Sequence, residues 1–319
     1  NINPQVFVNV FRKTEFKMKE EFRDIECLEN FLKKFKIKIL NLNQNPFITD
    51  NELKYLKEIK SLNIYNCKNI TGKIFENFST IEELNMNSCR KIKDQYVKDL
   101  KTLKFLNIGN CNKITDDSLQ YLTNIETLIM PSCKHITGKS FKNLKKIKKL
   151  DISNCNYDFL HIYTSINDNY ITNNALKHLT NLEELYMDFC NSNYINDDVF
   201  KYLPKLKKLN IKMCSLMTDK AFEYLENLEE LDINYCTNIT DKAFKHFKKL
   251  KVLNMSECSQ KTITDKAFTY LTNLKVLNMM GCSQQTININ KFNKNILLFK
   301  NLKLLDVSNC GINFLTIKK

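Results

Sequence analysis

The chain has 319 residues, 43% of them hydrophobic, so it is long enough to bury a sizeable core. It has only 5 Gly and 4 Pro, which disfavours a fold built on many glycine and proline turns, and no apolar run approaches the roughly 18 residues of a membrane span. Lys and Arg outnumber Asp and Glu by 49 to 35, for a net charge of +14, but Arg, the usual base-reading residue, is scarce, so the composition favours a lysine-coated surface over nucleic-acid binding.

The first 36 residues predict one strand and one helix. Val6, Val8 and Val10 alternate with other residues, as in a strand. Between residues 25 and 35 the apolar positions recur at helical spacing, which predicts an amphipathic helix. Basic residues are scattered through residues 1–20, so this segment does not resemble a secretory signal.

From residue 37 onward the chain repeats one nine-position pattern, L-x-x-L-x-[IM]-x-x-C, as in Ile59–Cys67 and Leu103–Cys111. Twelve copies begin at residues 37, 59, 81, 103, 125, 147, 182, 206, 228, 250, 274 and 302. The alternating apolar positions predict a short strand in each copy. A Thr-Asp pair and apolar residues three apart follow, as after Ile239, and predict a short capped helix. A unit of this size cannot bury its apolar side alone, so successive units must stack.

The pattern resembles the leucine-rich repeat. The cysteine at position nine and the Ile-Thr-Asp after it resemble the cysteine-containing subtype, best known from substrate-recognition arms of F-box proteins, although the spacing of 22 residues is closer to internalin-type repeats. The resemblance implies an α/β solenoid of about 12 coils, curved, with parallel strands on the concave face and short α or 3₁₀ helices on the convex face. Residues 1–36 would form an N-terminal cap of one strand and one amphipathic helix, and residues 37–319 the repeat domain. Residues 3–11 resemble the opening of an F-box, but the chain lacks the usual Trp.

Eleven of the twelve cysteines occupy position nine of the pattern, and only Cys27 lies outside it. No C-x-x-C pair occurs and His is scarce, which disfavours a zinc site. One thiol per coil in a single column gives no unique disulfide pairing. We therefore predict a structural ladder of small buried side chains and a reducing compartment. The predicted ladder comprises Cys67, Cys89, Cys111, Cys133, Cys155, Cys190, Cys214, Cys236, Cys258, Cys282 and Cys310.

Position five of the pattern is Asn or Asp in all but two copies, where Ile129 and Tyr186 replace it. Because leucine-rich repeats often carry Asn or Asp there, we attribute this column to structure and solubility. Aromatic and Met side chains, by contrast, are favoured at protein interfaces. Four of them fall on three successive copies and form what we call the aromatic patch: Tyr186, Phe189, Met213 and Tyr235. We predict that this patch contacts a protein partner.

One copy is 35 residues long because thirteen extra residues follow Cys155. The resulting insertion, residues 156–170, is rich in aromatic residues, and insertions in repeat proteins often mark the binding face. We predict that Tyr157, Phe159 and Tyr163 contact the same partner as the aromatic patch. Lysines cluster just before the strands, on the opposite rim, which we interpret as a solvated edge rather than a docking site for an acidic partner.

The chain has 4 scattered His, no Gly-rich phosphate loop and no acid–base constellation, so we predict no enzymatic activity, no cofactor and no metal site. The family resemblance implies a cytoplasmic protein-interaction scaffold, and in particular a substrate-recognition subunit of a ubiquitin ligase. Two alternatives stay open. One is an assembly protein that self-associates through an uncapped C-terminal edge after Cys310. The other is a viral or parasite effector that acts in the host cytoplasm.

Overall fold

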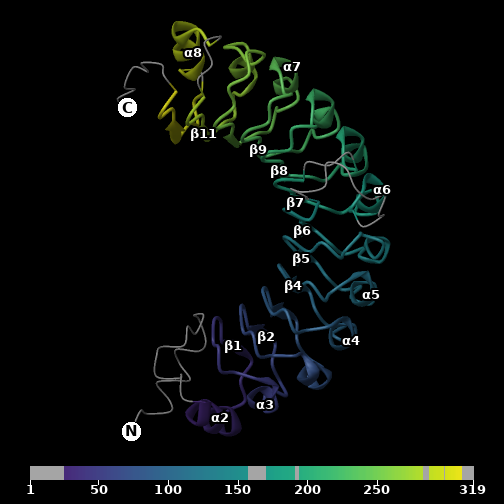
Figure 1. The fold of residues 1–319 in the computed structure, drawn as a ribbon. Helices are drawn as coiled ribbons and strands as arrows, with labels where there is room; N and C mark the ends of the chain where they lie inside the picture. Colours follow the sequence, from purple (N-terminus) through teal and green to yellow (C-terminus); the bar gives the residue numbers. More distant parts are fainter. Residues whose placement is uncertain (1–24, 157–169, 191–193, 283–286, 298, 311–319) are drawn as a thin grey trace, which may run out of the picture. The chain divides into compact units, whose positions relative to one another are not determined.

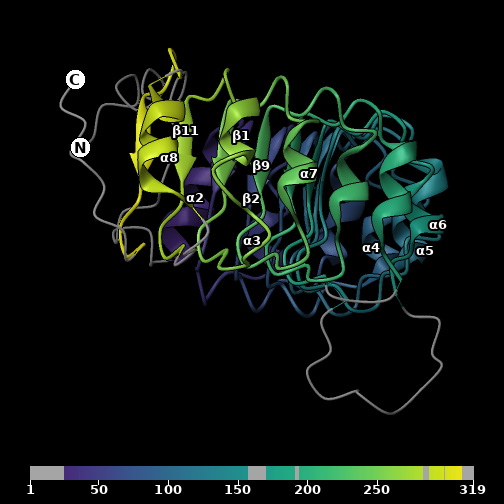
Figure 2. The ribbon, with the colours of Figure 1, turned by 90° about the horizontal axis from the view of Figure 1, so that it is seen from above.

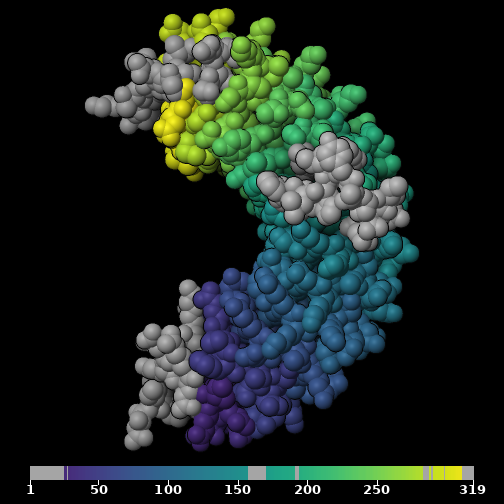
Figure 3. Space-filling model, viewed as in Figure 1, coloured from purple at the N-terminus to yellow at the C-terminus, as the bar shows by residue number. Residues whose placement is uncertain are grey.

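The computed structural model describes residues 25–156, 170–190, 194–282, 287–297 and 299–310. The chain divides into two compact units, Asn1–Ile147 (unit 1) and Lys148–Lys319 (unit 2). Each unit is a stack of coils, with a row of parallel strands on one side and a row of short helices on the other (Figure 1, Figure 2). In the space-filling view, the coils within each unit lie against one another (Figure 3).

The first described element of unit 1 is helix α2 (Ile25–Lys34), and five strands that pair in parallel in chain order follow it. The strands are β1 (Ile39–Asn41), β2 (Ser61–Asn63), β3 (Glu83–Asn85), β4 (Phe105–Asn107) and β5 (Thr127–Ile129). The helices that follow the strands are α3 (Asp50–Leu53), η2 (Lys73–Asn77), α4 (Asp94–Val97), α5 (Asp116–Leu119) and η3 (Phe141–Asn143), where η marks a 3₁₀ helix.

Unit 2 continues the same alternation with seven parallel strands. The strands are β6 (Lys149–Asp151), β7 (Glu184–Tyr186), β8 (Lys208–Asn210), β9 (Glu230–Asp232), β10 (Val252–Asn254), β11 (Val276–Asn278) and β12 (Leu304–Asp306). The helices are α6 (Asn173–Leu176), η4 (Asp197–Tyr202), η5 (Asp219–Phe222), α7 (Asp241–Phe244), η6 (Ala267–Tyr270) and α8 (Ile289–Ile296).

The register of the strands aligns equivalent positions of neighbouring coils, so Leu185 of β7 lies beside Leu209 of β8 and Leu231 of β9. Positions four and six are buried in every coil from β1 to β11. On the helix side the core is largely phenylalanine in unit 2, where Phe244 and Phe268 pack edge to face with ring centroids 6.4 Å apart. Parallel strands of period two therefore present one apolar row to the core and leave positions three, five and seven on the opposite face.

Threonines and aspartates at the helix starts link neighbouring coils at six junctions among the described residues. Thr115 caps α5 by accepting a hydrogen bond from the N–H of Asp117. The same threonine donates its hydroxyl and its own N–H to the carboxylate of Asp94, which begins the helix of the preceding coil, at 2.8 and 2.9 Å. Thr240 and Asp219 repeat this arrangement in unit 2. The motif therefore terminates a loop, starts a helix and joins two coils at once.

The architecture expected from the repeats is confirmed within each unit: parallel strands, short α or 3₁₀ helices, and twelve coils in the chain. Helix α2 occupies the segment where an amphipathic helix was expected, and it buries Leu28 and Leu32. The strand expected at residues 6–10 lies outside the described residues, and the assignment of residues 1–36 as a cap stays a prediction. No helix in the described ranges is long and apolar enough to cross a membrane.

Candidate partner-binding surface

The polar column at position five has a structural role. In each coil that carries Asn or Asp there, the side-chain Oδ1 accepts a hydrogen bond from the backbone N–H of position seven, at 2.9–3.2 Å. Asn63 and Tyr65 form one such pair, and Asp232 and Asn234 another. This side-chain turn shapes the chain as it leaves the strand and supplies an acceptor for an otherwise open donor. The column therefore needs no ligand to explain it.

The two interruptions of the column differ in kind. At the first, Ile129 is followed at position seven by Pro131, which has no N–H, so nothing is lost when the acceptor is removed. At the second, Tyr186 is followed by Asp188, whose N–H has no position-five acceptor. Tyr186 is therefore a departure from the repeat that the backbone does not compensate by itself.

Position eight adopts a left-handed backbone in all twelve coils, with φ between 57° and 70°. The N–H of this residue donates to the position-seven carbonyl of the next coil, as Asn66 N does to Asn87 O at 2.8 Å, so the stacking itself requires this conformation. Most coils carry Asn, Ser, Gln or Gly there. Three successive coils carry Phe189, Met213 and Tyr235, and a left-handed backbone costs such residues about 1 kcal/mol each relative to Gly.

The structure brings the aromatic patch together on the strand side of unit 2. Tyr186 lies in β7, and the three left-handed residues Phe189, Met213 and Tyr235 follow β7, β8 and β9 in adjacent coils. Met213 is 37% exposed and Tyr235 46% exposed, so neither side chain gains burial from its strained backbone. The combination of strain and exposure indicates that these side chains serve something other than stability.

Lysines lie over two of these rings. Lys149 Nζ lies 4.8 Å from the centroid of the Tyr186 ring and pairs with Glu184 at 2.9 Å, and Lys212 Nζ lies 6.0 Å from the centroid of Phe189. Both arrangements are cation–π contacts that hold a positive charge against an aromatic face.

Asp188 is a residue that the sequence pattern did not single out. It lies at position seven of the β7 coil and is half-buried. Burial raises the pKa of the Asp188 carboxyl to about 6, and the nearby carboxylates of Asp232 and Asp151 add to the rise. The signal available in the sequence was the loss of the position-five acceptor two residues earlier. Asp188 therefore shares a surface with the aromatic patch and carries a carboxylate that is costly to keep ionised.

The insertion after Cys155 is closed at its base by one side chain. Asn156, which is 4% exposed, donates from Nδ2 to the carbonyl oxygen of Ile171 at 2.9 Å and accepts from the N–H of the same residue at 3.1 Å. At the end of the insertion, Tyr170 stacks on Tyr194 with ring centroids 4.6 Å apart. The predicted contact residues Tyr157, Phe159 and Tyr163 lie outside the described residues, so their role stays a prediction.

Comparison with known sequences decides the family. The model for the "BspA type Leucine rich repeat region (6 copies)" matches residues 25–148 and 141–229, and the model for "Leucine rich repeat" matches residues 227–283. The chain belongs to the leucine-rich-repeat family. The cysteine-containing subtype remains a resemblance of this leucine-rich-repeat protein rather than a separate match. A search of curated proteins finds no match.

Solved structures share the fold at low sequence identity. An internalin (inlF) from Listeria monocytogenes is 17% identical with a TM-score of 0.59, over 90% of this chain and 88% of that one. The yeast Rad7 and Elc1 complex gives 16% identity and a TM-score of 0.52, over 88% of this chain and 83% of that one. The mouse RP105/MD-1 complex is 18% identical with a TM-score of 0.53, over 87% of this chain and 57% of that one. Identities this low establish a common fold and nothing more specific.

The cysteine ladder of this leucine-rich-repeat protein is buried, and all eleven position-nine cysteines carry free thiols. The thiol of Cys111 donates to the carbonyl oxygen of Met86, at position six of the preceding coil, at 3.1 Å, and the thiol of Cys236 does the same to Ile211 at 3.0 Å. Burial raises the pKa of Cys111 to about 12. The ladder therefore consists of protonated thiols that join neighbouring coils, and it has the properties of a structural element rather than a reactive one.

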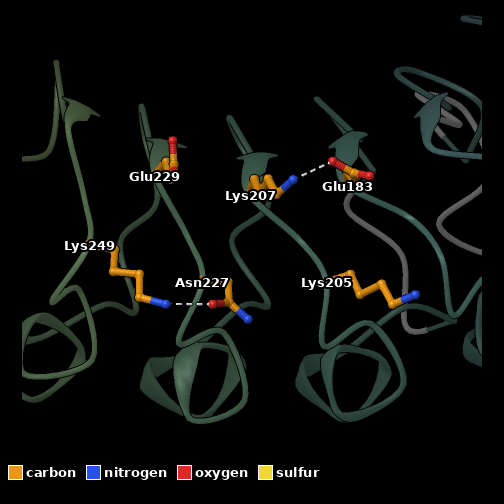
Figure 4. Close-up of a pocket in the computed structure, with 6 residues that line it drawn as sticks. All are labelled: Glu183, Lys205, Lys207, Asn227, Glu229 and Lys249. Atoms are coloured by element: carbon orange, nitrogen blue, oxygen red, sulfur yellow. Dashed lines mark hydrogen bonds and ion pairs between the residues drawn. The ribbon is translucent and has the colours of Figure 1, made fainter.

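The lysines on the rim before the strands are largely paired. Lys207 donates to Glu183 at 2.6 Å and Lys249 to Asn227 at 2.7 Å, around a shallow, open hollow between neighbouring coils of unit 2 (Figure 4). Exposed pairs of this kind contribute little to binding or stability. The rim is consistent with the solvated edge expected from the sequence. Among the described residues, no group of three or more His, Cys, Asp or Glu side chains could hold a metal ion.

Proposed function

We propose that this leucine-rich-repeat protein is a non-enzymatic scaffold that binds a protein partner on the strand side of unit 2. The observation that carries the proposal is the run of Phe189, Met213 and Tyr235 at left-handed position eight in three successive coils. Asn or Gly, which tolerate a left-handed backbone best, fill this position in five of the nine other coils, and no other coil has an aromatic or Met side chain there, so stability alone does not account for the choice. Exposed aromatic and Met side chains on a rigid row of strands are the anchors that protein interfaces use most.

Tyr186, which stands where the other strands of unit 2 carry Asn or Asp, supports the same location for the interface. It gives up the side-chain turn that Asn or Asp provides in the other strands of unit 2, and it places an aromatic ring beside the run at position eight. The insertion follows Cys155 in the preceding coil, whose strand β6 pairs with β7. We expect Tyr157, Phe159 and Tyr163 to extend the interface.

The compartment and the biological setting are further parts of the proposal. Eleven free, buried thiols favour a reducing compartment such as the cytoplasm. A substrate-recognition subunit of a ubiquitin ligase is the specific version that the family resemblance suggests. Self-association is the second candidate, and it is favoured by Leu297 and Leu304 near the last strand, which are 75% and 58% exposed.

Affinity capture with mass spectrometry tests the proposal. The intact chain is compared with the double variant Tyr186→Asn plus Tyr235→Asn, and with a variant that lacks residues 157–168. Tyr224→Asn serves as the matched control, because Tyr224 is 49% exposed but lies on the helix side, just after η5. We expect the double variant to lose partners that the intact chain and the control both retain. Equal recovery by all variants would remove the strand side of unit 2 as the interface.

A further inference from the structure

The strand side of unit 2 is acidic although the chain is strongly basic. We define the unit-2 strand face as the side chains at positions three, five, seven and eight of the coils from β6 to β12. It carries three lysines, Lys149, Lys208 and Lys212, against seven carboxylates, whereas the whole chain has a net charge of +14. The carboxylates are Asp151, Glu184, Asp188, Glu230, Asp232, Glu257 and Asp306. The same positions in unit 1 carry a single charge, on Glu83, so the acidity is specific to unit 2.

Two of the three lysines are already engaged by carboxylates at position three. Lys149 pairs with Glu184 at 2.9 Å, and Lys208 pairs with Glu230 at 3.1 Å and with Glu184 at 3.6 Å. The lysines therefore balance the carboxylates of position three and leave those of positions five, seven and eight in excess. An excess of negative charge at short range attracts a cationic ligand and repels the phosphates of a nucleic acid.

A chain of hydrogen bonds on this face engages the side-chain donors of Asn234, Ser256 and Asn254. Asn234 Nδ2 donates to Ser256 Oγ, Ser256 Oγ donates to Asn254 Oδ1 at 2.8 Å, and Asn254 Nδ2 donates to Asp232 Oδ2 at 2.8 Å. The ionised carboxylate of Asp232 can only accept, so it fixes the direction of every bond in the chain. This direction also fixes the orientation of the Asn234 amide. Its Nδ2 donates to Ser256, and its Oδ1 is left as an acceptor at the end of the chain of bonds.

Two buried acceptors are left without a donor on this face. In the part of the chain that the structure describes, neither Asp188 Oδ1 nor Asn234 Oδ1 has a hydrogen-bond partner. Asn234 is only 7% exposed, and both residues lie at position seven, flanking the coil of Lys212. An unsatisfied buried acceptor destabilises the fold, so its presence at two matching positions calls for an external donor.

A shallow groove of about 200 Å³ on the same face is lined by residues of β7 to β10, including Asp232 and Asn254 of the hydrogen-bonded chain that ends at Asn234. Tyr186 and Asp232 are on its walls, with Asn210 between them. A long side chain with an apolar stem and a cationic end fits such a groove, because its stem packs on the aromatic ring while its charge reaches the carboxylates.

We propose that the unit-2 strand face binds a basic segment of a protein partner, with Lys or Arg side chains donating to Asp188 and Asn234. This inference rests on the proposed function and names the chemistry of the partner. The rings of Phe189 and Tyr235 and the side chain of Met213 border the acceptors and shield the new ion pair from water, as residues around an interface hot spot do.

Selection from a phage-displayed library of random peptides against the full chain tests the proposal. We expect the selected peptides to be enriched in Lys and Arg, and to bind the Asp188→Asn variant about tenfold more weakly in fluorescence anisotropy. The matched control is Asp198→Asn, which removes one carboxylate from an exposed site at the start of η4, on the helix side. It should leave peptide affinity unchanged.

The pH dependence provides a second readout. Asp188 faces Asp151 on β6, Lys212 after β8 and Asp232 on β9, and its carboxyl has a pKa of about 6. Protonation removes the charge that holds the peptide, so affinity should fall as the pH drops from 7.5 to 5.5. The Asp188→Asn variant should lose this pH dependence.

The outcomes separate this inference from the proposed function. Selected peptides that depend on Tyr235 but carry no basic excess would overturn the inference and leave partner binding on this face intact. If no peptide is recovered whose binding depends on Tyr235, both proposals are overturned. A labelled single-stranded DNA that binds and is displaced by the basic peptides would also overturn it, because the face would then accept a polyanion.

Discussion

Asn156 Oδ1 lies 3.1 Å from the backbone nitrogen of Ile171, and Asn156 Nδ2 lies 2.9 Å from the carbonyl oxygen of the same residue. In regular coils the equivalent isoleucine donates to the carbonyl of the position-nine cysteine, as Ile70 N does to Cys67 O at 3.4 Å. The insertion separates Ile171 from Cys155 in sequence, and the amide of Asn156 takes over the bond. A single side chain thus lets the chain add a loop and return to the core at the usual place.

Replacing Asn156 with Ala should therefore destabilise the protein by about 2 kcal/mol, because two hydrogen bonds are lost and buried backbone groups of Ile171 are left unpaired. The midpoint of urea denaturation measures the effect. Asn124→Ala is the control, since Asn124 also donates to a backbone carbonyl, of Lys101 at 2.9 Å, but at a more exposed site. The control should cost about 0.5 kcal/mol or less. Equal losses of stability in the two variants would contradict the role assigned to the Asn156 side chain.

Replacing Tyr235 with Asn should raise stability while it lowers partner binding. Asn tolerates the left-handed backbone at φ 58° better than Tyr does, and the exposed Tyr ring loses little burial, so we expect a gain of about 0.5–1 kcal/mol. Thermal denaturation and partner capture are measured on the same preparation. Gln44→Asn, at the same position in the first coil, should gain stability without affecting capture. A loss of stability in Tyr235→Asn would show that the ring supports the fold.

Replacing Asp188 with Asn should stabilise the protein in a pH-dependent way. The folded-state pKa of about 6 is above the usual value, so the native state takes up the proton first as the pH falls. The ionised carboxylate is thus a destabilising group that is fully present above pH 6 and relieved as the pH falls through 6 toward the unfolded value near 3.9. We expect the melting temperature of the variant to exceed that of the wild type at pH 7.5, and the difference to shrink by pH 4. A difference in melting temperature that does not change with pH would contradict the raised pKa of Asp188.

The ladder cysteines should be unreactive in the folded protein. With a pKa of about 12, the thiol of Cys111 is ionised in only about one molecule in ten thousand at pH 8. In a Cys27→Ser variant, Ellman's reagent should label no thiol under native conditions and all eleven in urea. Rapid labelling of several thiols in the native protein would show that the ladder opens readily.

The repeat allowed the fold to be predicted from the sequence because each coil restates the same local rules. Period-two apolar positions place Leu62 and Ile64 on the buried side of a strand, and Thr115 before a helical pattern caps a helix in the way that the sequence indicates. The aromatic patch was predicted from the sequence because Phe189, Met213 and Tyr235 are interface-type side chains on three successive copies.

What the sequence determined by itself is therefore the coil: its strand, its capped helix and its thiol, because these depend on contacts between near neighbours that recur in every copy. Only the tertiary structure decided that position eight is left-handed, that the Asn column is a backbone cap, and that Asp188 and Asn234 keep unsatisfied acceptors. The left-handed backbone and the orientation of Asn234 depend on contacts where one coil meets the next, between residues more than twenty apart in the chain, whereas the cap joins residues two apart and appears only once the strand and turn have formed. A linear pattern shows which residue departs from the repeat, but the cost of that departure depends on the neighbours that stacking brings to it.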